Sequence, residues 1–420
     1  MNQQSNFGKF ILLWAGGLIS SIGGGLTSFG LGVYIFNRTG SAAGMALVTL
    51  LGFLPTLLFS VPAGVLADRY DRRLLMMIGD GFSALGIIYI LLCMIGGDVQ
   101  LWQICLGVFV SSVFSALLEP SFRSTITDLL TKEEYSRASG LVSLAGSARY
   151  LFSPVLAGFL LSVSDVKLLL IIDICTFFLT AASTAAVRKS MTAAVVSRRV
   201  PFFRSMKEGW DAVRGSKGVF VLVMLSAVLT LFMGMFQILA EPLILAFKGA
   251  QTLGFAESVC ACGMLASGLI LGIRGIKGNH FRVLFISLTA AGLFMIGFGL
   301  FENMIPICIF GFAFFATLPF ANNCLDYLAR INIADEVQGR AWGIIGFLSQ
   351  IGYVIAYAIS GIAADKLGQF TGLGVGRGSA VVVRIAGICM TLVAVICSSS
   401  VSLRRLEKPE GELRNVHSPL

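Results

Sequence analysis

A few ionisable side chains in this sequence fall inside long apolar stretches. Glu119, Arg149 and Asp173 are the three whose chemistry matters most. A charge in a hydrocarbon environment is costly, so such a residue either pairs with an opposite charge or is neutralised by a proton. The chemistry open to these residues is reversible proton binding and the ion pairing that controls it. We treat them as candidate proton-binding groups.

Each candidate also has a purely structural interpretation. Glu119 precedes Pro120 and lies four residues before Arg123, so these two could form a local ion pair on a helix. Arg149 and Asp173 fall at compatible depths in neighbouring apolar stretches, so they could form a static pair that fixes helix packing. Asp326 lies further along the chain, and we expect it to act in a gate or in packing.

The sequence lacks the usual patterns for covalent chemistry or metal binding. It has two histidines, His280 and His417, and none of its nine cysteines forms a Cys-x-x-Cys pair. We therefore expect no metal site, no cofactor and no disulfide. The phosphate-binding pattern Gly-x-x-x-x-Gly-Lys-Ser/Thr is also absent from the sequence. These absences argue against an enzyme, including a membrane enzyme that acts on lipids.

The elements that carry the candidate residues must be membrane helices. Hydrophobic residues make up 56% of the 420 and charged residues 13%, whereas a soluble domain carries about 25% charge. Apolar runs of about 20 residues are long enough to cross the hydrocarbon. They predict an all-α integral membrane protein with twelve spans, near 10–36, 43–67, 74–96, 100–128, 138–163, 166–187, 218–246, 253–274, 282–301, 304–328, 340–364 and 378–400.

The first predicted span carries small residues at four-residue spacing. Small residues let membrane helices approach closely, so each row is a predicted packing face. The two rows are Gly16, Ser20, Gly24 and Gly17, Ser21, Gly25.

Lysine and arginine are concentrated in alternate connections between the predicted spans. Cytosolic loops carry such an excess, so we expect a multi-pass protein of the bacterial inner membrane with both termini in the cytosol. This bias accounts for the formal net charge of +9 without nucleic acid. The predicted domains are a six-helix bundle (1–187), a linker (188–217), a second six-helix bundle (218–403) and a tail (404–420). The linker holds either an amphipathic helix over 201–215 or a solvated connection.

The two predicted bundles resemble each other. The segment "KEEYSRASG" at 132–140 is similar to "DEVQGRAWG" at 335–343, and Arg137 matches Arg340 at an offset of 203 positions. The same offset matches Glu119 to Asn322. Internal repeats are typical of transporters whose halves rock around a central site.

A charged segment separates the second and third predicted spans. In "GVLADRYDRRLLM" (64–76), only Tyr70 is uncharged between Asp68 and Arg73. The segment resembles the signature loop of the major facilitator superfamily, G-x-L-a-D-r-x-G-r-k, except that Asp71 replaces the usual glycine. The segments "LLGFLPTLLFSVPAG", "SPVLAG" (153–158), "GMLASGLILG" (263–272) and "SGIAADKLG" (360–368) are similar to the macrolide-efflux and enterobactin-exporter branch.

The resemblance implies two pseudo-symmetric six-helix bundles, the major facilitator fold, and transport by alternating access. It also implies that the charged loop joins the two halves when the cytosolic side is closed. We expect Asp68, at a helix C-terminus where the macrodipole disfavours an anion, to be compensated by nearby arginines or by the helix start near Arg340. The predicted gating residues are Gly64, Asp68, Arg69, Arg72, Arg73, Asp326 and Arg340.

Proton coupling is a further expectation, and Glu119, Arg149 and Asp173 are its candidates. This family often carries an arginine earlier in the fourth helix. Alignment on Pro120 puts Ser111 or Ser112 at that position, which raises interest in Arg149.

A central pocket should be mostly apolar with a few polar groups. Since few fixed charges lie at mid-depth, we expect a large, mostly apolar substrate. The predicted substrate-binding residues are Tyr34, Gln237, Gln350, Tyr353 and Tyr357.

These features predict a secondary active exporter of amphipathic small molecules, such as macrolide-like drugs, driven by proton entry. The alternatives are an exporter of siderophores or other metabolites and a nutrient-uptake permease of the same fold. The expected partners are a small-molecule substrate, the proton and the lipid bilayer, with no nucleic acid, and the expected state is a monomer.

Overall fold

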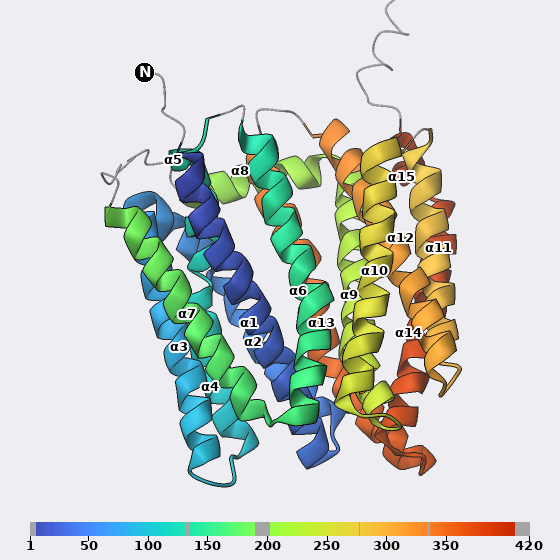
Figure 1. Ribbon diagram of the computed structural model, residues 1–420. Helices are drawn as coiled ribbons and strands as arrows, with labels where there is room; N and C mark the ends of the chain where they lie inside the picture. Colours follow the sequence, from blue (N-terminus) through green and yellow to red (C-terminus); the bar gives the residue numbers. More distant parts are fainter. Residues whose placement is uncertain (1–5, 132–133, 190–201, 277, 334–336, 408–420) are drawn as a thin grey trace, which may run out of the picture. The chain divides into compact units, whose positions relative to one another are not determined.

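The computed structural model describes residues 6–131, 134–189, 202–276, 278–333 and 337–407. Every regular element in these ranges is a helix, and twelve helical segments are long and apolar enough to cross a membrane (Figure 1). The predicted all-α class with twelve spans is confirmed.

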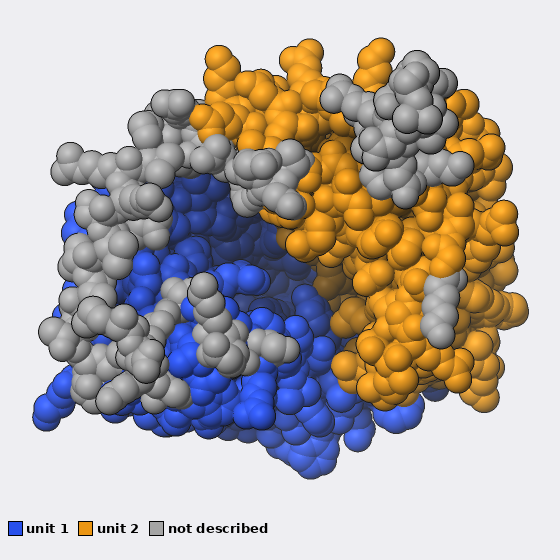
Figure 2. All heavy atoms as spheres, turned by 90° about the horizontal axis from the view of Figure 1, so that it is seen from above, with its two compact units in different colours: residues 1–198, 248–258 blue, residues 199–247, 259–420 orange. Residues whose placement is uncertain are grey.

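Contacts within the chain define two compact units, which Figure 2 colours separately. Unit 1 comprises residues 1–198 and 248–258, and unit 2 comprises residues 199–247 and 259–420. The helices of unit 1 are α1 (Phe7–Thr39), α2 (Ala42–Arg69), α3 (Arg72–Ile95), α4 (Leu101–Ser115), α5 (Leu118–Leu129), α6 (Tyr135–Val163) and α7 (Val166–Lys189).

The second unit contains the remaining helices. One of them, α10 (Ala250–Arg274), begins in unit 1 and ends in unit 2. The others are α8 (Phe202–Gly215), α9 (Lys217–Leu245), α11 (His280–Phe298), α12 (Met304–Ile331), α13 (Gln338–Thr371), α14 (Gly374–Ser398) and the short α15 (Val401–Arg405).

The fourth predicted span consists of two helices. The first, α4, ends at Ser115, and α5 begins at Leu118 with Pro120 in its first turn. Proline has no backbone N–H, so it is tolerated in a first helical turn but disrupts a helix interior. The break also places Glu119 in the first turn of α5, where the helix macrodipole favours an acid. The span predicted near 100–128 is confirmed as a candidate span over Leu101–Ile126, and its helix is interrupted between α4 and α5.

Glycines let α1 approach α7 in unit 1. Gly16, Gly23 and Gly30 follow at seven-residue spacing, and a methyl group on any of them would meet a side chain of α7. At Gly17 and Gly24 the same methyl would have no neighbour within 4 Å. Of the predicted four-residue rows, Gly16 packs on α7 and Gly25 on α6, but the glycines that face α7 follow a seven-residue spacing. A seven-residue repeat is what helices crossing at a small angle require.

The amphipathic helix predicted over 201–215 forms as α8, in the linker. Its Val213 is fully buried, and the ring of Trp210 meets that of Phe220 edge-on at 6.5 Å. The helix contacts α9 and α13. It is packed into unit 2 and is not a solvated connection.

In unit 2, α9 and α13 pack with almost no space between their backbones. The Ser226 and Ser349 hydroxyls lie 2.5 Å apart, and the Thr230 hydroxyl donates to the backbone oxygen of Ser349. At Gly352, an added Cβ would collide with the backbone oxygen of Ala227. This contact positions the polar residues of α13 described below.

We predict that Gly352→Ala destabilises the protein by about 1–3 kcal/mol, because the methyl group must push α13 away from the α9 backbone. Thermal unfolding of the purified protein in detergent measures this effect. The matched control is Gly343→Ala in the same helix, where a methyl would meet nothing within 4 Å. Equal melting temperatures for the two variants would contradict the packing described here.

Candidate functional site: a polar pocket and two charged clusters

Arginines at the start of α3 tie the α2–α3 turn to α5. Arg72 Nη1 lies 2.6 Å from Asp128 Oδ1 and donates to the backbone oxygen of Ser124, while its Nε donates to the backbone oxygen of Ala67. Arg73 is buried, with its Nη2 3.9 Å from Asp128 Oδ2. The Asp128 carboxylate and the two backbone oxygens thus hold the ends of α2, α3 and α5 together through these arginines.

Asp71, the residue that departs from the signature loop, has two structural roles. Its Oδ1 accepts a hydrogen bond from the Arg73 backbone and caps α3, and its Oδ2 lies 2.7 Å from Arg188 Nε at the end of α7. Burial acts to raise the pKa of the Asp71 carboxyl, but the Arg188 guanidinium and the backbone N–H groups outweigh burial and hold this pKa below its usual value. The pair links α3 to α7.

The predicted gating residues fall into several environments. Arg72 and Arg73 are engaged as described, Arg69 is exposed at the end of α2, and Gly64 is half-buried in that helix. The side chains of Asp68 and Arg340 lie outside the described residues, so the predicted compensation of Asp68 stays a prediction. Sequence reasoning missed the partners Asp128 and Arg188, because they lie far along the chain from the loop.

The three candidate proton-binding residues also differ. Asp173 of α7 is 1% exposed, and its Oδ1 accepts a 3.4 Å hydrogen bond from Thr176. The exposed Arg149 of α6 interacts with it electrostatically without forming an ion pair within 4 Å. Glu119 is exposed and forms the local ion pair with Arg123 at 2.7 Å, which is the structural alternative considered for it.

Glycines of α1 shape the surroundings of Asp173 and Arg149. A methyl group at Gly23 would lie 2.9 Å from Asp173 Oδ1, and one at Gly25 would lie 3.3 Å from Arg149 Cγ. The acid and the base therefore pack on the same short stretch of α1 from α7 and α6. Their coupling roles stay predictions.

Sequence reasoning missed a second buried acid, Asp80 of α3. It is 1% exposed, and its Oδ2 has no hydrogen-bond partner within the described part of the chain. The signal was available, since Asp80 is an isolated acid in an apolar run, just as Asp173 is. The cost of a buried unpaired charge makes it a further candidate for proton binding.

Unit 2 contains a pocket of about 380 Å³ between α9, α12 and α13. Its walls are largely apolar, with Leu229 and Met233 from α9 and Ile345 from α13. Its polar groups are Ser226, Thr230, Asn322, Asp326, Trp342, Ser349, Gln350 and Tyr353. The composition is that of a ligand pocket, in which a few polar groups orient a mostly apolar molecule.

Two polar atoms on residues that line this pocket are buried and have no hydrogen-bond partner among the described residues. They are Gln350 Oε1 and Trp342 Nε1, an acceptor and a donor. The Trp342 ring is also covered by the Arg330 guanidinium, at 5.3 Å from the ring centre. Buried polar groups are normally hydrogen-bonded, so these two atoms are ready to bond to a ligand that enters.

The predicted substrate-binding residues separate into two groups. Gln350 and Tyr353 line the pocket, and Asp326, predicted for gating, also lines it. Tyr357 is buried one turn beyond Tyr353 and donates its hydroxyl to Gln237 Oε1 at 2.9 Å, and Tyr34 of unit 1 accepts from Arg38 Nη1 at 3.0 Å. Trp342 and Asn322 are pocket residues that the sequence-based set did not contain.

The sequence profile of the Major Facilitator Superfamily matches residues 13–357. Macrolide efflux protein A of Streptococcus pyogenes is 27% identical over 95% of this chain and 97% of its own length. The protein of the same name from Enterococcus faecalis is 28% identical over 72% of this chain and 96% of its own length. The chain belongs to the major facilitator superfamily, a family of transporters.

Solved structures give the same fold. A bacterial homologue of the human lysosomal transporter Spinster superposes with a TM-score of 0.75 and 13% identity over the full length of both chains. A bacterial homologue of the iron transporter ferroportin superposes with a TM-score of 0.74 and 13% identity, over 94% of this chain and all of the other chain. The predicted major facilitator fold is therefore confirmed.

We predict that Arg188→Gln lowers stability at pH 7 by up to about 1 kcal/mol, since the pair is partly exposed. Because the pKa of Asp71 is lowered in the folded protein, the stability contributed by this ion pair is complete above about pH 3.9. That contribution is lost as the pH falls through the folded-state pKa of Asp71. The difference between variant and wild type should therefore shrink at about pH 3.

Denaturation of both proteins at the two pH values measures this effect. Arg188→Gln should cost little in an Asp71→Asn background, because its partner is already neutral. A loss of equal size at both pH values would contradict the pairing.

Proposed function

We propose that this protein exports amphipathic small molecules of the macrolide type in exchange for protons. The observation that carries the proposal is the 27% identity to macrolide efflux protein A over nearly the whole of both chains. Alternating access by a secondary active transporter needs no covalent chemistry, so the protein would not be an enzyme. In the proposed setting it is a monomer in the bacterial inner membrane, with the ends of this chain in the cytosol.

The pocket of unit 2 supports a mostly apolar substrate with a few hydrogen-bonding groups. Gln350 Oε1 would accept from a substrate hydroxyl, and Trp342 Nε1 would donate to a carbonyl or ether oxygen. Both atoms lack partners within the described residues, so a bond to either gains interaction energy without breaking one in the protein. Asp326 would attract an amine, such as the amino sugar that many macrolides carry.

The surroundings of Asp173 support a role in proton coupling. A carboxylate that is 1% exposed in a membrane span has a large cost as an anion. Binding a proton removes that cost. When the proton leaves, the positive charge of the nearby Arg149 reduces the cost of the Asp173 anion. Because both residues pack on α1, a change in the charge of Asp173 acts directly on the contacts between α1, α6 and α7.

We predict that cells producing the protein accumulate less of a macrolide than cells without it, and that an uncoupler removes the difference.

Gln350→Leu should weaken transport about tenfold, because a buried hydrogen bond to substrate is lost. The same variant should retain its stability, because it removes a buried oxygen that has no partner among the described residues.

The matched control is Gln369→Leu, an exposed position near the end of the same helix, which should transport normally. Uptake that rises when the protein is produced would contradict export and favour a permease. Unchanged macrolide levels combined with lower siderophore levels would move the substrate class to siderophores.

We predict that Asp173→Asn abolishes uncoupler-sensitive efflux while substrate exchange across vesicles continues, because binding and rocking remain and only proton binding is lost. Asp165→Asn, at an exposed position, is the control. Asp80→Asn tests the second buried acid in the same assay. Full uncoupler-sensitive efflux by both buried-acid variants would contradict coupling through these residues.

A further inference from the structure

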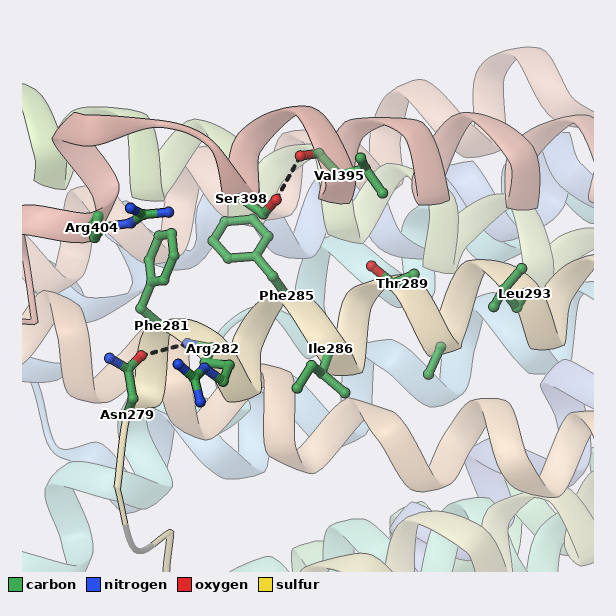
Figure 3. A pocket seen from close by; sticks show the side chains of 11 residues that line it. Asn279, Phe281, Arg282, Phe285, Ile286, Thr289, Leu293, Val395, Ser398 and Arg404 are labelled. Atoms are coloured by element: carbon green, nitrogen blue, oxygen red, sulfur yellow. Dashed lines mark hydrogen bonds between the residues drawn. The ribbon is translucent and has the colours of Figure 1, made fainter.

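A second and larger cavity lies in unit 2, on helices other than α9, α12 and α13, which line the proposed substrate pocket. It is an open groove of about 800 Å³ between α11 and the α14–α15 segment (Figure 3). It shares no residue with the proposed substrate pocket. Its lining changes from charged at one end to apolar at the other.

The apolar end of the groove lies on membrane-spanning helices. Ile286 and Leu293 of α11 are 62% and 54% exposed, and Val395 of α14 is 55% exposed. From Arg282 to Leu293 the helix rises about 16 Å at 1.5 Å per residue. That is about half of the 30 Å hydrocarbon, so the groove has the length of one acyl chain in one leaflet.

The polar end of the groove carries two exposed arginines. Figure 3 shows Arg282 of α11 and Arg404 of α15 at the same end, on either side of Phe281. The Arg404 guanidinium lies 5.9 Å from the centre of the Phe281 ring. Within the described residues neither arginine has a carboxylate within 4 Å, so the same end of the groove carries two positive charges that no described acid pairs.

The surrounding contacts hold Arg404 in place. Leu403 and Leu406, on either side of it, are buried. The nearby acid, Glu407, is already engaged, because its two oxygens accept hydrogen bonds of 2.9 Å from the backbone N–H groups of His280 and Phe281. It caps the start of α11 and, in the described part of the chain, forms no ion pair within 4 Å with either arginine.

We propose that this groove binds an anionic phospholipid, with its phosphate between Arg282 and Arg404 and one acyl chain along Ile286, Leu293 and Val395. Basic pockets at the ends of membrane helices recognise anionic headgroups, and each arginine near the surface contributes to that attraction. The Asn279 side chain, which caps α11 through the Arg282 backbone N–H at 2.7 Å, lies beside the phosphate position. The site is independent of the substrate and direction proposed above.

A second copy of this chain fits the groove less well than a lipid. In a two-fold dimer the same patch faces itself. Four arginines would then meet at one interface, and like charges at close range oppose association. An anionic headgroup neutralises the same charges.

Titration of the purified full-length protein in detergent tests the proposal, with phosphatidylglycerol as the probe and native mass spectrometry as the readout. Phosphatidylglycerol should bind tightly and phosphatidylcholine of the same chain length weakly. Arg282→Gln and Arg404→Gln should each weaken phosphatidylglycerol binding about fivefold. Arg405→Gln, an exposed neighbour that does not line the groove, should leave binding unchanged.

Four results would overturn the proposal. Equal binding of the two lipids would remove the role of the headgroup charge. An equal loss in Arg405→Gln would reduce the effect to general surface charge. Competition by inorganic phosphate as strong as that by the intact lipid would indicate a free-anion site. Dimers that persist after lipid removal would assign the groove to a second copy of the chain. Ile286→Ser should weaken the binding of a long-chain lipid without affecting that of a short-chain analogue. That result would support the proposed position of the acyl chain along Ile286.

Discussion

The bilayer cannot hydrate a polar group, and this constraint explains where the charges of the protein lie. Near the α2–α3 turn they form ion pairs, in which Arg72 pairs with Asp128 and Arg188 pairs with Asp71. Inside the spans some polar groups are left without full satisfaction, among them Asp80, Gln350 and Trp342. A folded membrane protein tolerates such groups at a cost. We propose that these positions mark where protons and ligands bind, whereas the paired charges link neighbouring helices.

Close helix packing makes these buried polar groups possible. Gly23 lets α1 lie directly over Asp173, and Gly352 lets α13 lie directly on the α9 backbone beside Gln350 and Tyr353. Gly352 lies on the same helix as Gln350 and Tyr353, whereas Gly23 faces Asp173 from the neighbouring helix. A shift of one helix would thus change both packing and the environment of a functional side chain, which is the mechanical link that alternating access requires. The lipid groove lies apart from these contacts, on helices α11 and α14.

Hydropathy and loop charge predicted the helices well, because each span is a local property of about 20 residues. Helical spacing on α13 also predicted Gln350 and Tyr353 as pocket residues. Pairings between distant residues were not predictable in this way: Asp71 was recognised as a departure, but its partner Arg188 lies on another helix. Tyr357 and Gln237 were both expected to face substrate, yet they bond to each other. The break between α4 and α5 was signalled by Pro120, and Asp80 could have been found by the rule that selected Asp173.

We propose a direct coupling of substrate and proton movements through this fold. Its most direct test uses the purified protein in proteoliposomes that contain a pH-sensitive dye and no other transporter. A macrolide gradient imposed across the membrane should drive protons in the opposite direction, and the internal pH should change at a rate that rises with the gradient. Macrolide movement with no proton movement would contradict coupled exchange, and no movement of either would contradict macrolide transport itself.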